Sequence, residues 1–188
     1  MITGVFSGSF NPIHIGHLVL ANWICEFCDI DELWFLVSPQ NPQKKESELI
    51  DEKLRFKMVE SATTGYKKFR ASDFEFSLPR PSYTINTLRS LCEKYPDREF
   101  CLIIGADSWK SISGWKDYEA LITEFPILIY PRKDHEIIIP EKYTNIRQMN
   151  APLIEISSSF IRQSVKEGKD IRYFLPETIR EMQDLLIP

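Results

Sequence analysis

The N-terminal residues predict a strand, a tight loop and the start of a helix. Residues 1–17 read MITGVFSGSFNPIHIGH. The run from Ile2 to Ser7 is short and apolar, which predicts a buried strand, and Gly16 to Phe27 carries apolar residues at helical spacing. The junction Gly8 to His17 joins the two. A strand followed at once by a helix is the repeating unit of sheets with helices on both faces.

The same alternation continues along the chain. Strands are predicted at Ile2–Ser7, Glu32–Val37, Phe69–Phe76, Phe100–Ile104, Pro126–Tyr130 and Leu153–Ile156, and helices at Gly16–Phe27, Asp51–Thr63, Tyr83–Tyr95, Ser158–Glu167 and Pro176–Leu186, with one more helix before the fifth strand. This order predicts an α/β fold, a doubly wound parallel sheet with C-terminal helices on or beside it. No composition shift marks a linker, so we expect residues 1–188 to form a single domain.

Composition is that of an ordinary globular protein and argues against several classes of function. Of the 188 residues, 43% are hydrophobic and 27% are charged. No run of about eighteen apolar residues suggests a membrane span, and the first residues do not resemble a secretion signal, so we expect a cytoplasmic protein without a membrane partner. The net charge of −4 argues against nucleic acid as a partner.

The four cysteines raise the question of a zinc site. Cys25 and Cys28 form a C-x-x-C spacing, but neither Cys92 nor Cys101 has a second cysteine or a histidine nearby to complete four ligands. We therefore interpret them as reduced thiols in the core or on a helix face, and expect no metal held by protein side chains.

Two histidines at the first junction form a candidate anion site. His14 and His17 are three residues apart at a helix start, so both side chains can point to the same side, next to N–H groups without a helical partner. Gly16 lets a ligand approach the backbone, and Gly8 permits the turn out of the strand. Either histidine alone could be a turn residue or a helix cap. The junction as a whole favours phosphate binding.

The junction resembles the H-x-G-H motif of the nucleotidylyltransferase superfamily, and Gly8 to Pro12 resemble its bacterial nicotinate mononucleotide adenylyltransferases. The second superfamily motif has its counterpart in ISSSFIR, Ile156 to Arg162. Serines at a helix start can cap it and donate hydrogen bonds, and a guanidinium can bind phosphate oxygens. Alone, this pattern would be only a capped helix. The resemblance implies that His14, His17 and Arg162 are catalytic and bind the phosphates of ATP.

Further motifs are similar to those of the same family. PSYT at 81–84 resembles the segment that presents N–H groups to the carboxylate of nicotinate, and IGAD at 104–107 resembles the segment whose aspartate holds ribose hydroxyls. The residues that the resemblance assigns to ATP are Gly8, Ser9, Phe10, Gly16, Gly105, Asp107, Arg132, Ile156, Ser157 and Ser158, and those that it assigns to the acceptor are Asn11, Ser82, Tyr83, Thr84 and Trp115.

Three alternatives stay open for these motifs. Asp107 could only cap the next helix, and Tyr83 to Thr84 could be a routine helix start. Trp109 lies six residues before Trp115 and could take its place against the pyridine ring, or either indole could fill the core.

The loop Ser38–Ser47 departs from the family pattern. Relatives show P-P-H-K there, whereas this chain has PQNPQKK at 39–45. We expect a cation over the triphosphate from this loop, supplied by either Lys44 or Lys45, and count both among the candidate catalytic residues.

The resemblance implies an adenylyltransferase of NAD biosynthesis. The phosphate of nicotinate mononucleotide would attack the α-phosphorus of ATP, with Mg²⁺ accompanying ATP and pyrophosphate leaving, by positioning and electrostatics without a covalent intermediate. Two alternatives remain: a sister transferase that uses nicotinamide mononucleotide or another phosphate acceptor, and a nucleotide-binding module without activity. Relatives differ in assembly, so a homo-oligomer is left open.

Overall fold

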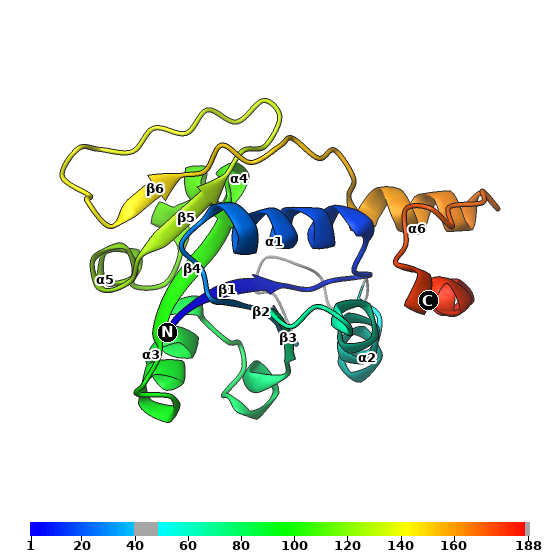
Figure 1. Cartoon of the computed structure of the whole chain (residues 1–188), viewed down its shortest axis with the longest axis horizontal. Coiled ribbons are helices and arrows are strands. Elements are labelled where there is room, and N and C mark those ends of the chain that lie inside the picture. The colour runs from blue at the N-terminus through cyan, green and yellow to red at the C-terminus, as the bar shows by residue number, and fades with distance from the viewer. Residues whose placement is uncertain (40–48, 187–188) are drawn as a thin grey trace.

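A parallel sheet forms the centre of the fold (Figure 1). The computed structural model describes residues 1–39 and 49–186. Within them the sheet has six strands: β1 (Ile2–Gly8), β2 (Glu32–Val37), β3 (Phe69–Ser72), β4 (Glu99–Gly105), β5 (Ile127–Tyr130) and β6 (Ile146–Gln148). The strand order is β3-β2-β1-β4-β5-β6, and every neighbouring pair is parallel. The predicted doubly wound α/β fold is confirmed.

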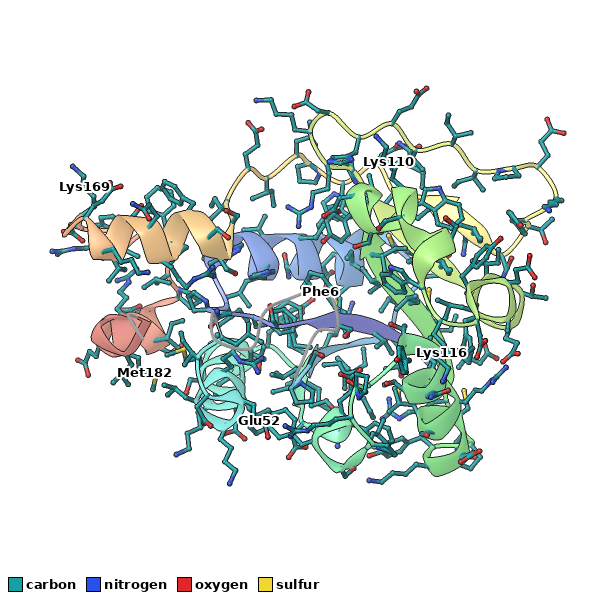
Figure 2. All side chains as sticks on the ribbon, turned by 180° about the vertical axis from the view of Figure 1, so that it is seen from behind. Phe6, Glu52, Lys110, Lys116, Lys169 and Met182 are labelled. Carbon is teal, nitrogen blue, oxygen red and sulfur yellow. The ribbon has the colours of Figure 1, made fainter. Side chains whose placement is uncertain are left out.

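The helices cover both faces of this sheet. The first face packs against α1 (Ile15–Phe27) and α2 (Glu52–Thr63), and the second against α3 (Thr84–Lys94), α4 (Ala106–Lys110) and α5 (Tyr118–Glu124). Successive strand residues serve opposite cores, as the pleat requires: Phe6, labelled in Figure 2, joins the first core and Val5 the second. Two apolar cores therefore hold the sheet between two helical layers.

The C-terminal elements lie beyond the carboxyl end of β1, next to the start of α1 (Figure 1). They are α6 (Ser158–Lys166) and η4 (Glu177–Leu186), and the backbone N–H of Ile15 donates to the carbonyl of Phe174 in the segment between them (2.9 Å). Residues from the two ends of the sequence thus meet at the edge where β1 and β4 point.

That edge is the switch point of the doubly wound sheet. From β1 the chain proceeds to β2 and β3 on one side, and β4 lies on the other side of β1. Because connections leave in opposite directions here, the carboxyl ends of β1 and β4 open a crevice in which such folds bind ligands. Gly8 and Gly105 end these two strands.

The predicted strand at Leu153–Ile156 is wrong, and the sixth strand is Ile146–Gln148 instead. The apolar alternation that suggested a strand has another cause. Ile154 and Ile156 are partly buried against the first core, the one between the sheet and α1 and α2, while Leu153 is exposed. The segment crosses the end of the sheet without pairing and leads to α6.

Three other boundaries differ from expectation. The strand expected at Phe69–Phe76 ends at Ser72 and continues as the 3₁₀ helix η2 (Phe74–Ser77). The last helix is a 3₁₀ helix, Glu177–Leu186. The region before β5 holds α4, the 3₁₀ turn η3 (Ile112–Gly114) and α5 where we expected one helix. The spacing of apolar residues locates the buried segments. It does not distinguish an α-helix from a 3₁₀ helix, and it does not show where one helix is interrupted by a short turn.

The cysteines lie where the core interpretation puts them. All four are free; Cys25 and Cys101 are buried, and burial raises the pKa of both thiols to about 12. In the described part of the chain, no helix has the length and apolar character needed to cross a membrane.

Candidate active site

The loop after β1 is a buried scaffold. Phe10 adopts a φ of 42°, and its ring packs edge-on against Phe6 (centroids 5.8 Å) and His17 (5.1 Å). Ser9, Phe10 and Asn11 are 7%, 2% and 1% exposed. This packing fixes where α1 begins. The contacts expected from Ser9, Phe10 and Asn11 to substrates stay predictions.

The imidazoles of His14 and His17 stack at the start of α1. Their centroids are 3.7 Å apart with an interplanar angle of 26°. The backbone N–H of His14 donates to Nδ1 of His17 (3.2 Å). In the neutral ring the proton of His17 is therefore on Nε2, so His17 can act as an N–H donor.

His14 is uncharged in this site at neutral pH. Burial, assisted by the positive charge of Arg132, lowers its pKa from 6.5 to about 4. Its Nδ1 is buried and has no hydrogen-bond partner among the described residues. Buried polar atoms are rarely left unpaired in folded proteins, so this nitrogen is a candidate ligand contact. His14 therefore enters the candidate anion site as a neutral imidazole, not as a cation.

Gly16 lies where a side chain would not fit. A Cβ at this position would be 3.0 Å from Cγ2 of Ile154 and 3.1 Å from Nδ1 of His14. The same residues line a narrow cleft that also contains His17 and Arg132. Glycine thus allows the segment before α6 to close on the histidine pair.

The late serine–arginine motif packs against the first loop. Ser157 caps α6, and its hydroxyl accepts a backbone N–H of the first turn (3.1 Å). The hydroxyl of Ser158 donates to the carbonyl of Pro12 (2.9 Å), and Nη1 of Arg162 donates to the carbonyl of Asn11 (2.7 Å). The structure therefore brings the two motifs together, as the sequence predicted, although 151 positions separate Asn11 from Arg162.

Asp107 faces Arg132 across the ends of β4 and β5. Nε of Arg132 is 3.7 Å from Oδ1 of Asp107, and Nη2 donates to the hydroxyl of Tyr130 (3.2 Å). Gly105, not Asp107, is the N-cap of α4, and a Cβ on Gly105 would meet Oδ1 of Asp107 at 2.3 Å. The carboxylate thus lies beside Gly105, and no side chain of the described residues caps this helix. Asp107 and Arg132 share a groove with Ile156 and Ser157.

A second cavity, of about 240 Å³, opens on the other side of the β1–β4 edge. Its walls include Ser82, Tyr83, Thr84 and Trp115, four of the five expected acceptor residues, whereas Asn11 does not line it. Lys116, labelled in Figure 2, also lines it and places Nζ 4.6 Å above the ring of Tyr83. The N-terminal end of α3 therefore faces this cavity, with a cation beside it.

The two tryptophans have different roles in the structure. Trp109 is 9% exposed, and its Nε1 donates to the carbonyl of Ile138 (3.0 Å), so it belongs to the core. Trp115 lines the cavity, and its Nε1 has no partner among the described residues. This places Trp115, not Trp109, where a ring could stack.

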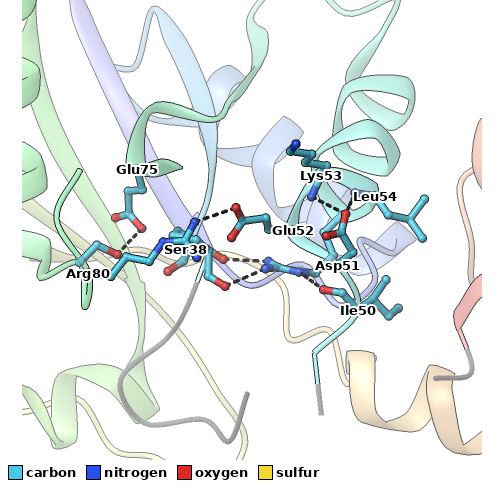
Figure 3. Close-up of polar contacts among 11 residues, drawn as sticks. Ser38, Ile50, Asp51, Glu52, Lys53, Leu54, Glu75 and Arg80 are labelled. Carbon is cyan, nitrogen blue, oxygen red and sulfur yellow. Dashed lines mark hydrogen bonds and ion pairs between the residues drawn. The ribbon is translucent and has the colours of Figure 1, made fainter. Parts of the chain in front are cut away.

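We did not single out Arg55 from the sequence. It is 1% exposed, and its guanidinium donates to the carbonyls of Ser9 (2.6 Å), Ser38 (2.8 Å), Pro39 (2.9 Å) and Ile50 (2.9 Å). Figure 3 shows Ser38 and Ile50 in this network. The only signal in the sequence was its spacing: an arginine three and four residues before the buried Met58 and Val59 lies on the core face of α2.

Glu75 was also not singled out. It is 3% exposed and lines the second cavity, where Oε2 accepts from the hydroxyl of Ser82 (3.0 Å) and Oε1 from that of Thr87 (3.0 Å). Burial raises the pKa of its carboxyl, and the hydroxyl donors, Ser38 included, oppose that shift. Glu75 lies between Phe74 and Phe76 in the predicted strand Phe69–Phe76, and nothing in that pattern indicates a buried carboxylate.

Lys44 and Lys45 lie outside the described residues. Among the residues that are described, no three side chains of histidine, cysteine, aspartate or glutamate gather as a metal site. Asp107, whose carboxylate shares a groove with Ile156 and Ser157, already faces Arg132. This donor set fits a divalent cation that brings phosphate oxygens as its further ligands.

Comparisons with known proteins identify the family of this chain. The cytidylyltransferase-like family model matches residues 5–164. A protein of Bacteroides fragilis (strain YCH46) named "Probable nicotinate-nucleotide adenylyltransferase" is 53% identical over 92% of this chain and 86% of its own length. One of Bacteroides thetaiotaomicron with the same name is 53% identical over 95% of this chain and 89% of its own.

A solved structure supports the fold. The nicotinic acid mononucleotide adenylyltransferase of Plasmodium falciparum, solved with APC, aligns with a TM-score of 0.78 at 23% identity over 98% of both chains. The same enzyme solved with NaAD gives a TM-score of 0.77. With a matched family model over most of its length and relatives at this level of identity, the chain belongs to the cytidylyltransferase-like family and, within it, to the nicotinate-nucleotide adenylyltransferases.

Proposed function

We propose that this enzyme transfers the adenylyl group of ATP to the phosphate of nicotinate mononucleotide, giving nicotinate adenine dinucleotide and pyrophosphate, a step of NAD biosynthesis. The observation that carries the proposal is the meeting of the histidine pair with Ser158 and Arg162 around the first loop. The names of the Bacteroides relatives support the same reaction.

The nucleophile needs no base from the protein. A phosphate monoester has a second pKa of about 6, so at neutral pH it arrives mostly as a dianion. It attacks the α-phosphorus in line as the bond to pyrophosphate breaks. The protein's work is then to hold two polyanions close together in the right orientation.

Repulsion between the substrates is the main barrier that the site must offset. Two unit charges about 4 Å apart interact by roughly 4 kcal/mol at an effective dielectric of about 20. Arg162 and Arg132 offer permanent cations on either side of the histidine pair. Arg55 adds a buried guanidinium under the loop, with carbonyls as its acceptors. We propose that Lys44 or Lys45 adds one more.

The histidines act as hydrogen-bond donors that orient the triphosphate. Nε2–H of His17 can donate to a phosphate oxygen, and the unpaired Nδ1 of His14 can do so in the tautomer that carries its proton there. An arriving polyanion would also raise the pKa of His14. We propose Mg²⁺ as the cation that accompanies ATP, where it would neutralise phosphate charge.

The acceptor binds, in this proposal, in the cavity at the start of α3. The backbone N–H of Thr87 is the first in this helix to donate to a helical carbonyl, that of Tyr83 (3.0 Å). The N–H groups before it are therefore available to an anion, which the helix dipole also favours. A carboxylate on the pyridine ring suits this end, and Trp115 can stack on the ring.

One assay tests the proposed function. The protein is mixed with ATP, Mg²⁺ and, in separate reactions, nicotinate or nicotinamide mononucleotide, and the products are separated and weighed by mass spectrometry. We expect nicotinate adenine dinucleotide and pyrophosphate in equal amounts, and much slower reaction with nicotinamide mononucleotide. Equal rates would assign the chain to a less selective sister activity, and no product with any mononucleotide would make it a binding module.

A further inference from the structure

Glu75 joins two points of the chain on either side of the start of α3. Ser82 precedes the N-cap residue Tyr83, and Thr87 lies in the first turn of the helix. Each donates its hydroxyl to a different oxygen of the Glu75 carboxylate at 3.0 Å. In helix nomenclature these are the positions N′ and N4, which in many helices are joined by an apolar contact that fixes how the chain enters the helix. Here a buried carboxylate joins them.

This arrangement controls where the first N–H groups of α3 point. The chain enters the helix through Tyr83 in an extended conformation (φ −110°, ψ 136°), and Ser82 and Thr87 are 9% and 1% exposed. Without the carboxylate, both hydroxyls would be buried without their acceptor, which costs free energy unless the entry segment moves. The walls of the acceptor cavity on this side, Tyr83 and Thr84, would move with it.

The same carboxylate connects the acceptor cavity with the loop between β1 and α1. The hydroxyl of Ser38 hydrogen-bonds to Glu75, and the carbonyl of Ser38 accepts from Arg55, which also donates to the carbonyl of Ser9. Figure 3 places Glu75 and Ser38 side by side at the end of β2. A chain of buried hydrogen bonds thus runs from α3 to the loop before α1, so it fixes one substrate site relative to the other.

We propose that Glu75 is a positioning residue that sets the start of α3 and thereby determines how strongly the enzyme prefers an acceptor with a carboxylate on its pyridine ring. This inference rests on the proposed function. Glu75 touches Ser82 and Thr87, and acts on the acceptor through them.

The first test replaces Glu75 with glutamine. Glutamine keeps the shape but has one acceptor oxygen in place of two, so only one of the two hydroxyls can still donate to this side chain. We expect Glu75→Gln to raise KM for nicotinate mononucleotide about tenfold and to lower the preference over nicotinamide mononucleotide by a similar factor, the effect of about one lost hydrogen bond. KM for ATP should stay within about twofold. Glu93→Gln, an exposed change on the same helix, is the matched control and should change neither.

The second test keeps the carboxylate and removes one donor. Thr87→Val deletes the hydroxyl at N4, and Thr63→Val deletes another buried hydroxyl, which donates to the carbonyl of Val59 in α2 (2.9 Å). Both variants should lose similar stability. Only Thr87→Val should raise KM for the acceptor and weaken the preference for nicotinate, by severalfold.

Both tests start from the wild-type activity. If the wild type makes no dinucleotide, the proposed function fails and the inference fails with it. If the wild type is active but folded Glu75→Gln and Thr87→Val keep its acceptor KM and its preference, the inference alone is overturned. The same holds if both variants raise the KM values for ATP and acceptor equally, because that is the result of a general structural role.

Discussion

The stacked imidazoles of His14 and His17 share one helix start but have different tasks. His17 accepts the N–H of His14 on Nδ1, which fixes its proton on Nε2, while His14 is held neutral by burial. We expect His17→Ala to lower kcat about a hundredfold to a thousandfold, the usual effect of losing a donor to developing charge. The melting temperature should change little, because His17 is only partly buried. Near-normal turnover in a folded His17→Ala variant would contradict its role at the phosphates.

The neutral state of His14 makes stability depend on pH. Its pKa falls from 6.5 to about 4 on folding, so between these values the unfolded chain binds more protons than the native one. The free energy of unfolding is therefore highest, with respect to His14, above pH 6.5. It decreases by up to about 3 kcal/mol as the pH falls toward 4. Urea unfolding from pH 7.5 to 4.5 should show a steeper loss for the wild type than for His14→Asn. Parallel curves for the two proteins would contradict the assignment.

Among the elements of the fold, α6 brings Arg162 next to the loop that precedes the two histidines. Arg162 donates one N–H to the carbonyl of Asn11 and has further donors for phosphate. Arg162→Lys keeps the charge but not the planar fork, and we expect it to lower kcat/KM for ATP about tenfold to a hundredfold. Arg172→Lys, in an exposed ion pair with Asp170, is the control and should be neutral. Equal activity of Arg162→Lys and wild type would show that this guanidinium does not bind the phosphates.

Local patterns in the sequence located most elements and both phosphate motifs. Local features predict only helix starts and a cap at H-x-G-H and at the serine–arginine segment, and the resemblance to a known family is what marks them as functional. The edge strand Ile146–Gln148 was missed because three residues carry too little periodicity, and Ile154 and Ile156 imitated a strand while packing next to α1. The residues adjacent in sequence do not predict which side chains the fold brings into contact. For this reason the sequence does not predict the hydrogen bonds of Glu75 to Ser82 and Thr87.

On the scale of the whole molecule, Arg55 ties together segments that are distant in sequence. Its acceptors lie in the loop after β1, at the end of β2 and just before α2. We expect Arg55→Met to reduce the free energy of unfolding by about 3–5 kcal/mol, because four carbonyls lose a charged donor in a buried place. Denaturant unfolding measures the loss.

The control for that change is Arg89→Met, which removes an exposed ion pair with Glu124. Its stability should stay close to that of the wild type, since solvent screens such pairs. If both arginine variants were equally stable, the buried network would not be what joins the loop after β1 to the rest of the fold.

The fold brings the histidine pair, α6 and the cavity at the start of α3 to one edge of the sheet, where we propose that the two anionic substrates meet. A crystal structure with a non-hydrolysable ATP analogue and nicotinate mononucleotide tests this most directly. We expect phosphate oxygens within hydrogen-bond distance of His17 Nε2 and the Arg162 guanidinium, and the pyridine ring stacked on Trp115. A triphosphate bound out of reach of either His17 or Arg162 would contradict the account.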